Sequence, residues 1–422
     1  MSKILKIYAR EILDSRATPT VEAVCVLNTG QVVVSSVPSG ASTGSHEVLE
    51  LRDNDPKRYK GKGVLNAITN VNQVLGPSVV SMDPMEQEKI DKKLIELDGT
   101  ENKSKMGANA MLAVSEVVTK AAAASAGIPL YSYIAGLAQK SGLKVNLKIP
   151  IPIFNMINGG LHGAGNLDFQ EFFVIPASSK TFTKDIQLGS EVYMMLGENL
   201  DRRGAIHSVG DEGGYAPNLF TNADAVEILV ETIKESPYDL GLDVFLGLDI
   251  AASTFFKNGV YQIRDKSSAL TEDALIDYYK NLNENYHLAI LEDPFNEDAW
   301  SGWHKLLSSL GNQTILVGDD LLATNPKRVQ KAITEKACNA VLVKPNQIGT
   351  VTETLQVINL ARSANWKIIV SHRSGETNDW FIADFAVGVS ADYVKFGAPA
   401  RGERVAKYNR LSSIELELTD KK

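Results

Sequence analysis

The chain has 422 residues, and its 43 basic and 51 acidic side chains give a formal net charge of −8 at pH 7. This acidic balance, without any long run of Lys or Arg, argues against a surface that binds nucleic acid or an anionic membrane. The composition is ordinary for a globular protein, and the length predicts two or three domains, or one small domain beside a barrel of roughly 250 residues.

The sequence lacks the marks of secretion and of membrane insertion. No stretch approaches the roughly 18 consecutive apolar residues of a membrane span, and Lys6, Arg10 and Glu11 interrupt any signal-peptide core. Cys25 and Cys338 are too far apart for a disulfide scaffold or a thiolate zinc site, so we expect two buried, reduced thiols. We therefore expect a cytoplasmic protein without a membrane span.

The first third of the chain has the pattern of strands followed by helices. Apolar runs at 20–27 and 31–37, joined by a turn, predict a β-hairpin. Three helical patterns follow, and the last two end in a glycine, which suits the C-terminus of a helix. We predict an N-terminal α+β capping domain over residues 1–138 and a linker at 138–148. The helical patterns cover residues 64–76, 84–99 and 108–127.

From residue 139 onward, apolar β-rich runs each end in one polar residue. Four of the five intervals between these residues are 23 to 28 residues long, near the length of one strand plus one helix, and the first is 43. This alternation indicates an α/β fold with a parallel sheet, and we predict a closed, TIM-like βα barrel over residues 139–422 as the catalytic domain. The carboxyl ends of barrel strands share the face that holds the active site. The side chains expected there are Asp249, Glu292, Asp319, Lys344, His372 and Lys395.

Three of these residues, Asp249, Glu292 and Asp319, are carboxylates on neighbouring strands. Three hard oxygen ligands without Cys or His suit a magnesium ion that keeps several waters or takes substrate oxygens. Each residue alone is better explained as a cap or an ion-pair partner of a nearby loop, but three at equivalent strand ends favour a metal site. Without a compensating cation, three converging carboxylates would repel one another strongly.

Two lysines, Lys344 and Lys395, end strands at the same face. A buried lysine beside another lysine and a divalent cation should have a lowered pKa and could act as a neutral general base. The alternative is that each lysine only neutralises the carboxylates. His372 alone would be a core histidine, but Arg373 and Ser374 beside it indicate a clamp for a phosphate or carboxylate, because a guanidinium fork matches a doubly charged oxyanion.

Two glycine-rich loops precede the regular pattern. The first surrounds His162 and ends at Gln170 and Glu171, and the second places Asp211 and Glu212 before a pair of glycines. Glycine loops beside acids suit a closing lid and a general acid. Either loop alone would be explained as ordinary turn chemistry with solvated acids.

Residues 40–44 fit the G-x-S-x-G pattern of a nucleophile elbow, which would make Ser42 a hydrolase nucleophile. The context disfavours this reading, because Pro38 interrupts the strand just upstream and the segment lies in the small first domain. The sequence has no Walker A motif, no second histidine that would complete a zincin motif after His46, and no G-x-G-x-x-G after a strand.

Over nearly the whole chain the motifs resemble those of the enolase family. The resemblance implies an enolase-type barrel and a magnesium-dependent hydro-lyase of glycolysis and gluconeogenesis that interconverts 2-phospho-D-glycerate and phosphoenolpyruvate. It also implies a homodimer or an oligomer of dimers. The motifs are, in order, DSRATPTVE, VPSGASTGSHE, NGGLHGAGNLDFQEF, VGDEGGYAPN, LEDPF, GDDLLATNP, VKPNQIGT, SHRSGET and FGAPARGERVAKYN.

The resemblance implies a metal role for four positions. Asp249, Glu292 and Asp319 match the ligands of a first magnesium ion. Ser39 matches the serine that helps to hold a second magnesium ion, which arrives with the substrate.

The resemblance also implies roles in the chemistry. Lys344 matches the base that removes the carbon-2 proton, and Glu212 matches the acid that protonates the departing carbon-3 hydroxyl. Gln170 and Glu171 match the partners that support this acid and the substrate, and His162 lies in a loop that closes over the substrate.

The remaining matches bind substrate. Arg373 and Ser374 match the phosphate binders, Lys395 faces the substrate carboxylate, and His372 completes the pocket. The implied catalytic residues are therefore Glu171, Glu212, Lys344, His372 and Lys395.

The sequence departs from the family pattern at Ala17 and Thr18, where Gly-Asn is usual, and at Thr254, where Glu is common. None is an implied catalytic position, but an altered turn near residue 17 could change how the first domain meets the barrel or a neighbouring subunit. Two alternatives stay open. One is a superfamily relative that acts on another carboxylate substrate, and the other is a non-catalytic binding protein with Lys421 and Lys422 exposed to a partner.

Overall fold

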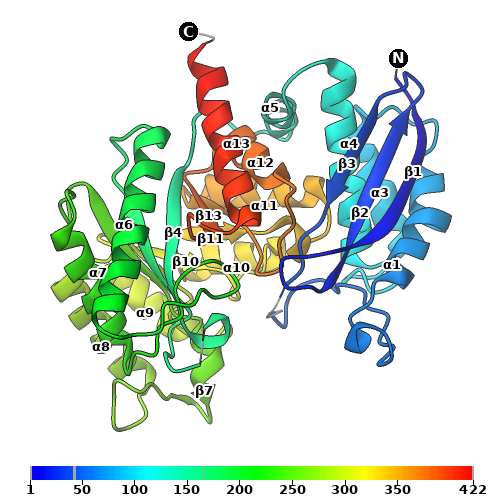
Figure 1. Cartoon of the computed structure of the whole chain (residues 1–422). Helices are drawn as coiled ribbons and strands as arrows, with labels where there is room; N and C mark the ends of the chain where they lie inside the picture. Colours follow the sequence, from blue (N-terminus) through cyan, green and yellow to red (C-terminus); the bar gives the residue numbers. More distant parts are fainter. Residues whose placement is uncertain (1, 41–43, 164, 421–422) are drawn as a thin grey trace.

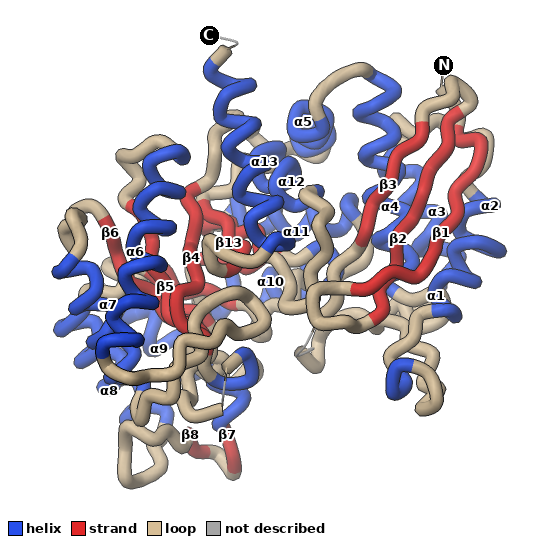
Figure 2. Tube along the Cα trace, viewed as in Figure 1, coloured by secondary structure: helices blue, strands red, loops and turns tan. Residues whose placement is uncertain are grey.

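The structure is a computed structural model that describes residues 2–40, 44–163 and 165–420. Figure 1 shows the β1–β3 sheet backed by helices on one side of the molecule and a barrel with surrounding helices on the other. Figure 2 shows the same division by secondary structure, with the long C-terminal helix in the middle of the view. The predictions that concern Ser42, Lys421 and Lys422 lie outside the described residues.

The N-terminal part is built on an antiparallel sheet in which β2 lies between β1 and β3. The predicted hairpin is confirmed as β2 and β3, whereas β1 has no counterpart among the predicted elements. An irregularity in its register between Ile4 and Lys6 brings Ile4, Ile7 and Ala9 to the buried side, so no strict alternation is visible in the sequence. The strands are β1 (Ile4–Leu13), β2 (Pro19–Leu27) and β3 (Val32–Ser36).

Helices pack on this sheet and follow the three predicted helical patterns. Gly99 and Gly127, which follow α3 and α4, have φ angles of 69° and 65°, the left-handed conformation that glycine adopts at a helix C-terminus. The helices are α1 (Leu65–Asn70), its π-helical continuation (Val71–Leu75), α2 (Gly76–Ser78), α3 (Gln87–Asp98), α4 (Ala108–Ala126) and α5 (Leu130–Lys140), with a 3-10 turn at Tyr59–Gly61.

The turn between β1 and β2 is organised by Asp14. Its Oδ1 accepts hydrogen bonds from the backbone N–H groups of Arg16 at 2.8 Å and Thr18 at 2.9 Å, and its Oδ2 accepts one from Ser39 Oγ at 2.5 Å. Within this turn Ala17 has a φ angle of 56°, which lies in the left-handed region. A residue with a Cβ atom loses roughly 1–2 kcal/mol there, so alanine strains this turn.

We expect Ala17→Gly to stabilise the protein by about 0.5–1 kcal/mol, because glycine has no Cβ atom to clash in the left-handed conformation. The gain is smaller than the full cost of the clash, because glycine also increases the conformational entropy of the unfolded chain. The measurement is the urea midpoint of unfolding at an unchanged m-value. Ala17→Val is the matched control and should lower the midpoint, because a β-branched residue tolerates this conformation least. An unchanged midpoint for the glycine variant would show that the turn carries no strain.

The C-terminal part confirms the predicted closed barrel, with eight strands in the order β10-β11-β12-β13-β4-β5-β6-β9. Asp249 and Glu292 are the last residues of β6 and β9, and Asp319, Lys344 and His372 directly follow β10, β11 and β12. The strands are β4 (Ile151–Asn158), β5 (Glu171–Pro176), β6 (Val244–Asp249), β9 (Ile290–Glu292), β10 (Ile315–Gly318), β11 (Ala340–Val343), β12 (Lys367–Ser371) and β13 (Tyr393–Gly397).

Helices cover the outside of the barrel (Figure 1). The long interval before Glu292 is explained by a small hairpin of β7 (Phe256–Lys257) and β8 (Val260–Tyr261), which precedes the helix. The helices are α6 (Phe182–Arg202), α7 (Asn222–Glu235), α8 (Glu272–Tyr286), α9 (Trp300–Leu310), α10 (Pro326–Glu335), α11 (Val351–Ser363), α12 (Phe381–Gly388) and α13 (Gly402–Thr419).

The prediction of an all-parallel sheet is wrong for one strand. β5 runs antiparallel to both β4 and β6, whereas the other neighbouring pairs in the barrel are parallel. Because β5 is reversed, its first residue, Glu171, reaches the edge at which the other strands end. There it pairs with Asn158, the last residue of β4, and with Asp249, the last residue of β6. Glu171 therefore enters the site from the start of its strand.

Three apolar clusters form the core of the described residues. One fills the barrel below the strand ends, a second packs the helices onto the outside of the barrel, and a third lies between β1–β3 and the helices behind them. The second cluster also contains residues of α5, which therefore packs with the barrel. The domain boundary at 138 and 139 stays a prediction. The cluster inside the barrel consists of Ile153, Phe173, Ile175, Ile290, Val317, Ala340, Leu342 and Ile369.

Among the described residues no single helix is long and apolar enough to cross a membrane. α4 and α5 meet both criteria only together, as a pair bent by 108°. Cys25 and Cys338 are free and buried, as expected, and burial raises the pKa of Cys25 to about 12.

Candidate active site

A cavity opens at the carboxyl ends of the barrel strands. All of the predicted site residues except Ser39 and Glu292 line it, so residues far apart in sequence meet at one place. The lining residues are His162, Gln170, Glu171, Glu212, Asp249, Ala251, Thr254, Asp293, Asp319, Asp320, Lys344, Ser371, His372, Arg373, Ser374 and Lys395.

Lys395 lies at the centre of one group of carboxylates. Its Nζ is 2.8 Å from Glu171 Oε2, 3.1 Å from Asp249 Oδ2 and 2.8 Å from Glu292 Oε1. Burial alone would lower the pKa of Lys395, but the charges of Asp249 and the two glutamates outweigh it and raise the pKa well above its usual value. The ring of Phe173 lies 5.1 Å below the ammonium group, a second favourable contact for a cation. Lys395 is therefore a fixed positive charge.

Lys344 pairs with Asp319, and the distance from Nζ to Oδ2 is 2.5 Å. The expectation of a lowered lysine pKa is not met in this arrangement. Burial lowers the pKa of Lys344, but the charge of Asp319 outweighs burial and raises it. In this structure Lys344 and Lys395 both contact carboxylates. These contacts agree with the alternative that each lysine neutralises acidic groups.

The acids at this end of the barrel carry more charge than the two lysines balance. Burial and the charge of Asp249 raise the pKa of Glu292 well above its usual value, and burial and Asp319 raise the pKa of Asp320 to about 7. These carboxyl groups resist ionising together unless another cation is present. Since hard carboxylate oxygens are the ligands that magnesium prefers, this donor set fits a divalent cation.

Two further acids join this group. One oxygen each of Asp293, Asp319 and Asp320 lie within 4.8 Å of one another. Asp293 orients the loop after β10, because its carboxylate accepts the backbone N–H groups of Asp319 at 3.0 Å and Asp320 at 2.7 Å. Asp249 and Glu292 lie outside this close group and are held by Lys395 instead. Sequence reasoning missed Asp293 and Asp320, although each directly follows a predicted ligand in LED and GDD.

Glu171 and Glu212 form a hydrogen-bonded pair on the other side of the cavity. Burial and the charge of Glu212 raise the pKa of Glu171 to about 7. Burial also acts to raise the pKa of Glu212, but the charge of His162 and contacts with His372 and Glu171 reverse this and hold it well below its usual value. Within the pair, Glu171 therefore has the higher pKa and Glu212 the lower one.

His162 and Ser374 contact this pair. His162 Nδ1 is 3.0 Å from Glu171 Oε1 and 3.5 Å from Glu212 Oε1, and its Nε2 is 3.2 Å from Ser374 Oγ. Ser374 Oγ donates a hydrogen bond to Glu212 Oε1 at 3.0 Å. Burial acts to lower the pKa of His162, but Glu212 and Glu171 outweigh it and raise the pKa. The predicted lid histidine and the predicted acid are thus in contact.

The tautomer of His372 follows from its neighbour Arg404, which was not predicted. Arg404 Nη1 lies 2.6 Å from His372 Nδ1, and a guanidinium can only donate, so Nδ1 accepts and Nε2 carries the proton. This N–H lies 3.2 Å from Glu212 Oε2. Burial lowers the pKa of His372 to about 3, so the ring is neutral. Sequence reasoning missed Arg404 because it is on α13 and not at a strand end.

Gln170 and Thr254 also line the cavity. Gln170 Nε2 donates a hydrogen bond to Asp249 Oδ2 at 3.2 Å, which fixes that carboxylate. Thr254, noted only as a departure from the family pattern, lies in the cavity wall. Its Oγ1 donates to the backbone oxygen of Ala251 at 2.9 Å.

Ser39 is not brought into the cavity. It is fully buried, and its hydroxyl donates a hydrogen bond to Asp14 in the β1–β2 turn. Arg16 Nη2 lies 3.3 Å from the same hydroxyl. In this arrangement the side chain supports the turn that contains Ala17, and its contacts give no support to a metal role.

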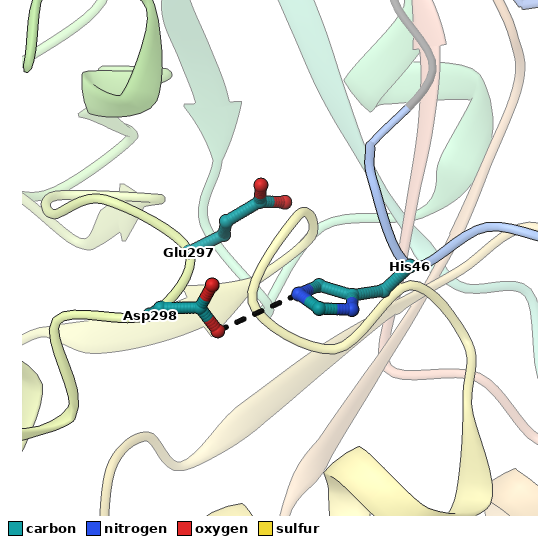
Figure 3. Close-up of side chains that lie close together, drawn as sticks. All are labelled: His46, Glu297 and Asp298. Atoms are coloured by element: carbon teal, nitrogen blue, oxygen red, sulfur yellow. Dashed lines mark ion pairs between the residues drawn. The ribbon is translucent and has the colours of Figure 1, made fainter.

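A second group with metal-ligand chemistry lies between the N-terminal part and the barrel (Figure 3). One ligand atom each of His46, Glu297 and Asp298 lie within 4.8 Å of one another, and His46 Nε2 is 3.4 Å from Asp298 Oδ1. Arg328 Nη2 donates to the same Oδ1 at 3.1 Å, so a guanidinium already balances this carboxylate. Ser45 Oγ donates to Glu297 Oε1 at 2.8 Å. These contacts tie the segment after residue 43 to the loop after β9.

Both parts of the chain match known protein families. Residues 4–134 match the family described as "Enolase, N-terminal domain". Residues 146–422 match the family described as "Enolase, C-terminal TIM barrel domain". Together the two matches cover nearly the whole sequence.

Proposed function

Because the chain belongs to the enolase family, we propose that it is a hydro-lyase that interconverts 2-phospho-D-glycerate and phosphoenolpyruvate in glycolysis and gluconeogenesis. The observation that carries this proposal is the meeting, around one cavity, of a lysine, a hydrogen-bonded carboxyl pair and an arginine–serine pair. These groups suit proton removal, proton donation and phosphate binding.

In the proposed reaction Lys344 removes the carbon-2 proton. That proton is weakly acidic, because its removal adds charge beside a carboxylate. Asp249, Glu292 and Asp319 would hold a magnesium ion, which would offset their charge and stabilise the charge that develops on the substrate carboxylate. With the charge of Asp319 offset in this way, burial and the charges of Arg373 and Lys395, which all act to lower the pKa of Lys344, would lose their main opponent, as a neutral base requires.

Glu212 protonates the leaving carbon-3 hydroxyl, because hydroxide is a poor leaving group. In the proposed reaction the proton reaches Glu212 along its hydrogen bond with Glu171, the member of the pair with the higher pKa. The protonated Nε2 of the neutral His372 ring lies 3.2 Å from Glu212 Oε2 and helps to orient this carboxyl group. Acid and base stand on separate groups, so the proton that Lys344 removes and the proton that Glu212 supplies are handled by different side chains.

The remaining residues bind and orient the substrate. Arg373 and Ser374 are proposed to bind the phosphate group, since a guanidinium and a hydroxyl match its oxygens. Lys395 faces the substrate carboxylate, and its raised pKa keeps it charged. Gln170 and His162 complete the enclosure from the loop before β5.

The test follows ultraviolet absorbance of the purified protein with 2-phospho-D-glycerate, since the enol phosphate product is conjugated. We expect absorbance to rise with magnesium, to stop when a chelator removes it, and to resume when magnesium is restored. The control compares unfolding midpoints with and without chelator, so that lost turnover is not mistaken for lost fold. A folded protein that shows no turnover with magnesium would contradict the proposal and favour another carboxylate substrate or a binding role.

Assembly, ion number and location form part of the same proposal. We expect two magnesium ions for each site, with the second arriving with substrate, and a homodimer or an oligomer of dimers in the cytoplasm. Light scattering in solution measures the assembly, and magnesium titration with and without substrate counts the ions.

A further inference from the structure

Arg373, the proposed phosphate binder, has a carboxylate partner from the N-terminal part of the chain. Arg373 Nη1 donates to Glu47 Oε2 at 2.9 Å, and Nη2 donates to Glu47 Oε1 at 3.2 Å. Both side chains are buried, with 4% and 6% of their surfaces exposed. This is the two-pronged geometry in which a guanidinium and a carboxylate fix each other's orientation.

Arg373 is held on a second side by the barrel. Its Nη1 also donates to Asn346 Oδ1 at 2.9 Å, so the contacts with Glu47 and Asn346 use at least three of the five N–H groups of the guanidinium. The plane of the guanidinium is therefore set by two residues that do not themselves line the cavity.

Glu47 is itself fixed by neighbours from both parts of the chain. Its Oε1 accepts a hydrogen bond from the backbone N–H of Gly44 at 3.1 Å and lies 3.4 Å from Gln347 Nε2. Gln347 also donates to Asp319 Oδ1 at 3.1 Å. One chain of hydrogen bonds thus connects the segment after residue 43, the phosphate arginine and a proposed metal ligand.

We propose that Glu47 is a positioning residue that aims the Arg373 guanidinium at the phosphate group of the substrate. The inference rests on the proposed function, because it assumes that a phosphate binds at Arg373. Arg373 also lies within the field of the carboxylate of Asp319. Glu47 competes with that attraction through two hydrogen bonds and, with Asn346, sets the orientation of the guanidinium. The arginine side chain therefore already has the orientation that binds phosphate, so it loses less conformational entropy on binding than a mobile side chain would.

The test is Glu47→Gln, which keeps the shape of the side chain and removes the charge. Phosphate binding is used equally in the ground state and the transition state, so KM for 2-phospho-D-glycerate should rise about tenfold or more while kcat changes by less than about threefold. The dissociation constant of inorganic phosphate, measured by calorimetry, should rise in parallel. Glu47→Asp keeps the charge but has a shorter side chain, so its carboxylate should not reach Arg373. It should also weaken phosphate binding. Agreement between the two variants would argue against a folding defect peculiar to Glu47→Gln as the cause of the loss.

Glu297→Gln is the matched control. Glu297 also contacts the segment after residue 43, through Ser45, but not Arg373. We expect its phosphate binding to equal that of the wild type. An equal loss in Glu47→Gln and Glu297→Gln would overturn the proposal, because it would show an effect of tethering the segment rather than of aiming the arginine. Unchanged phosphate binding in Glu47→Gln would also overturn it.

A double-mutant cycle with Arg373→Lys separates an effect through the guanidinium from a general one. Lysine keeps the charge but has no planar fork, so Glu47→Gln should weaken phosphate binding much less in this background than in the wild type. Fully additive losses would contradict the proposal. Because calorimetry needs no turnover, an inactive wild type that still binds phosphate in a Glu47-dependent way would contradict the proposed reaction and leave this inference standing.

Discussion

Lys344→Ala is expected to lower kcat for 2-phospho-D-glycerate by about 10²–10⁴-fold, the contribution of a positioned general base. The variant should also lose exchange of the carbon-2 proton with solvent deuterium, because the other described lysine that lines the cavity, Lys395, is held by three carboxylates. Absorbance measures turnover, and NMR measures exchange. The expected loss comes from chemistry, since phosphate binding uses other residues.

The control is Lys327→Ala, which removes an exposed lysine that pairs with Glu101 away from the cavity. It should keep wild-type turnover and exchange. Loss of Lys344 leaves Asp319 without its partner at 2.5 Å, so the unfolding midpoint is measured in parallel. Substantial carbon-2 exchange in a folded Lys344→Ala variant would remove Lys344 from the role of base.

Glu212→Gln should give a different signature. Glutamine keeps the shape of the side chain but has no carboxyl proton to give, so turnover should fall by about 10²–10⁴-fold. Exchange of the carbon-2 proton should persist, because Lys344 and the carboxylates around it are intact. The same two measurements, absorbance and NMR, therefore assign the two proton transfers to different residues.

Glu235→Gln is the comparison for this variant, because Glu235 is exposed and pairs with Arg202 on the outside of the barrel. It should behave as the wild type in both measurements. If Glu212→Gln lost exchange together with turnover, Glu212 would belong to the proton-removal step or to the support of Lys344, and the assignment of separate acid and base would be wrong.

The sequence could predict those site residues that a regular spacing marks. Asp249, Glu292, Asp319, Lys344 and His372 each end or directly follow an apolar run, and the closed barrel brings all five runs to one face. Lys395 was placed at a strand end but is the third residue of β13, which continues to Gly397. The prediction of its strand end is therefore wrong by two residues, but Lys395 still lies beside Asp249 and Glu292.

Features that depend on the direction of a strand or on contacts between the two parts could not be predicted in this way. A strand and its reverse have the same pattern of apolar residues, so the antiparallel course of β5 had no signal. Arg404 and Glu47 lie on a helix and in a loop, where charged residues are common, and only the fold brings them to His372 and Arg373. The pKa of Lys344 depends on a 2.5 Å contact that spacing does not define.

Lys395 lies on β13, the strand that pairs with β4, so the carboxylates of Glu171, Asp249 and Glu292 gain this positive partner late in synthesis. Lys395 lies on the last strand of the barrel, whereas Glu171, Asp249 and Glu292 belong to strands that leave the ribosome earlier. Domains fold from the N-terminal side as the chain emerges. A nascent chain that stops before β13 therefore holds these carboxylates without the ammonium that balances them, and it has an open seam beside β4. Arrival of the last strand closes the barrel and brings the Lys395 ammonium to its acidic end in one event, so a chain truncated before β13 should neither close nor retain a compact acidic pocket.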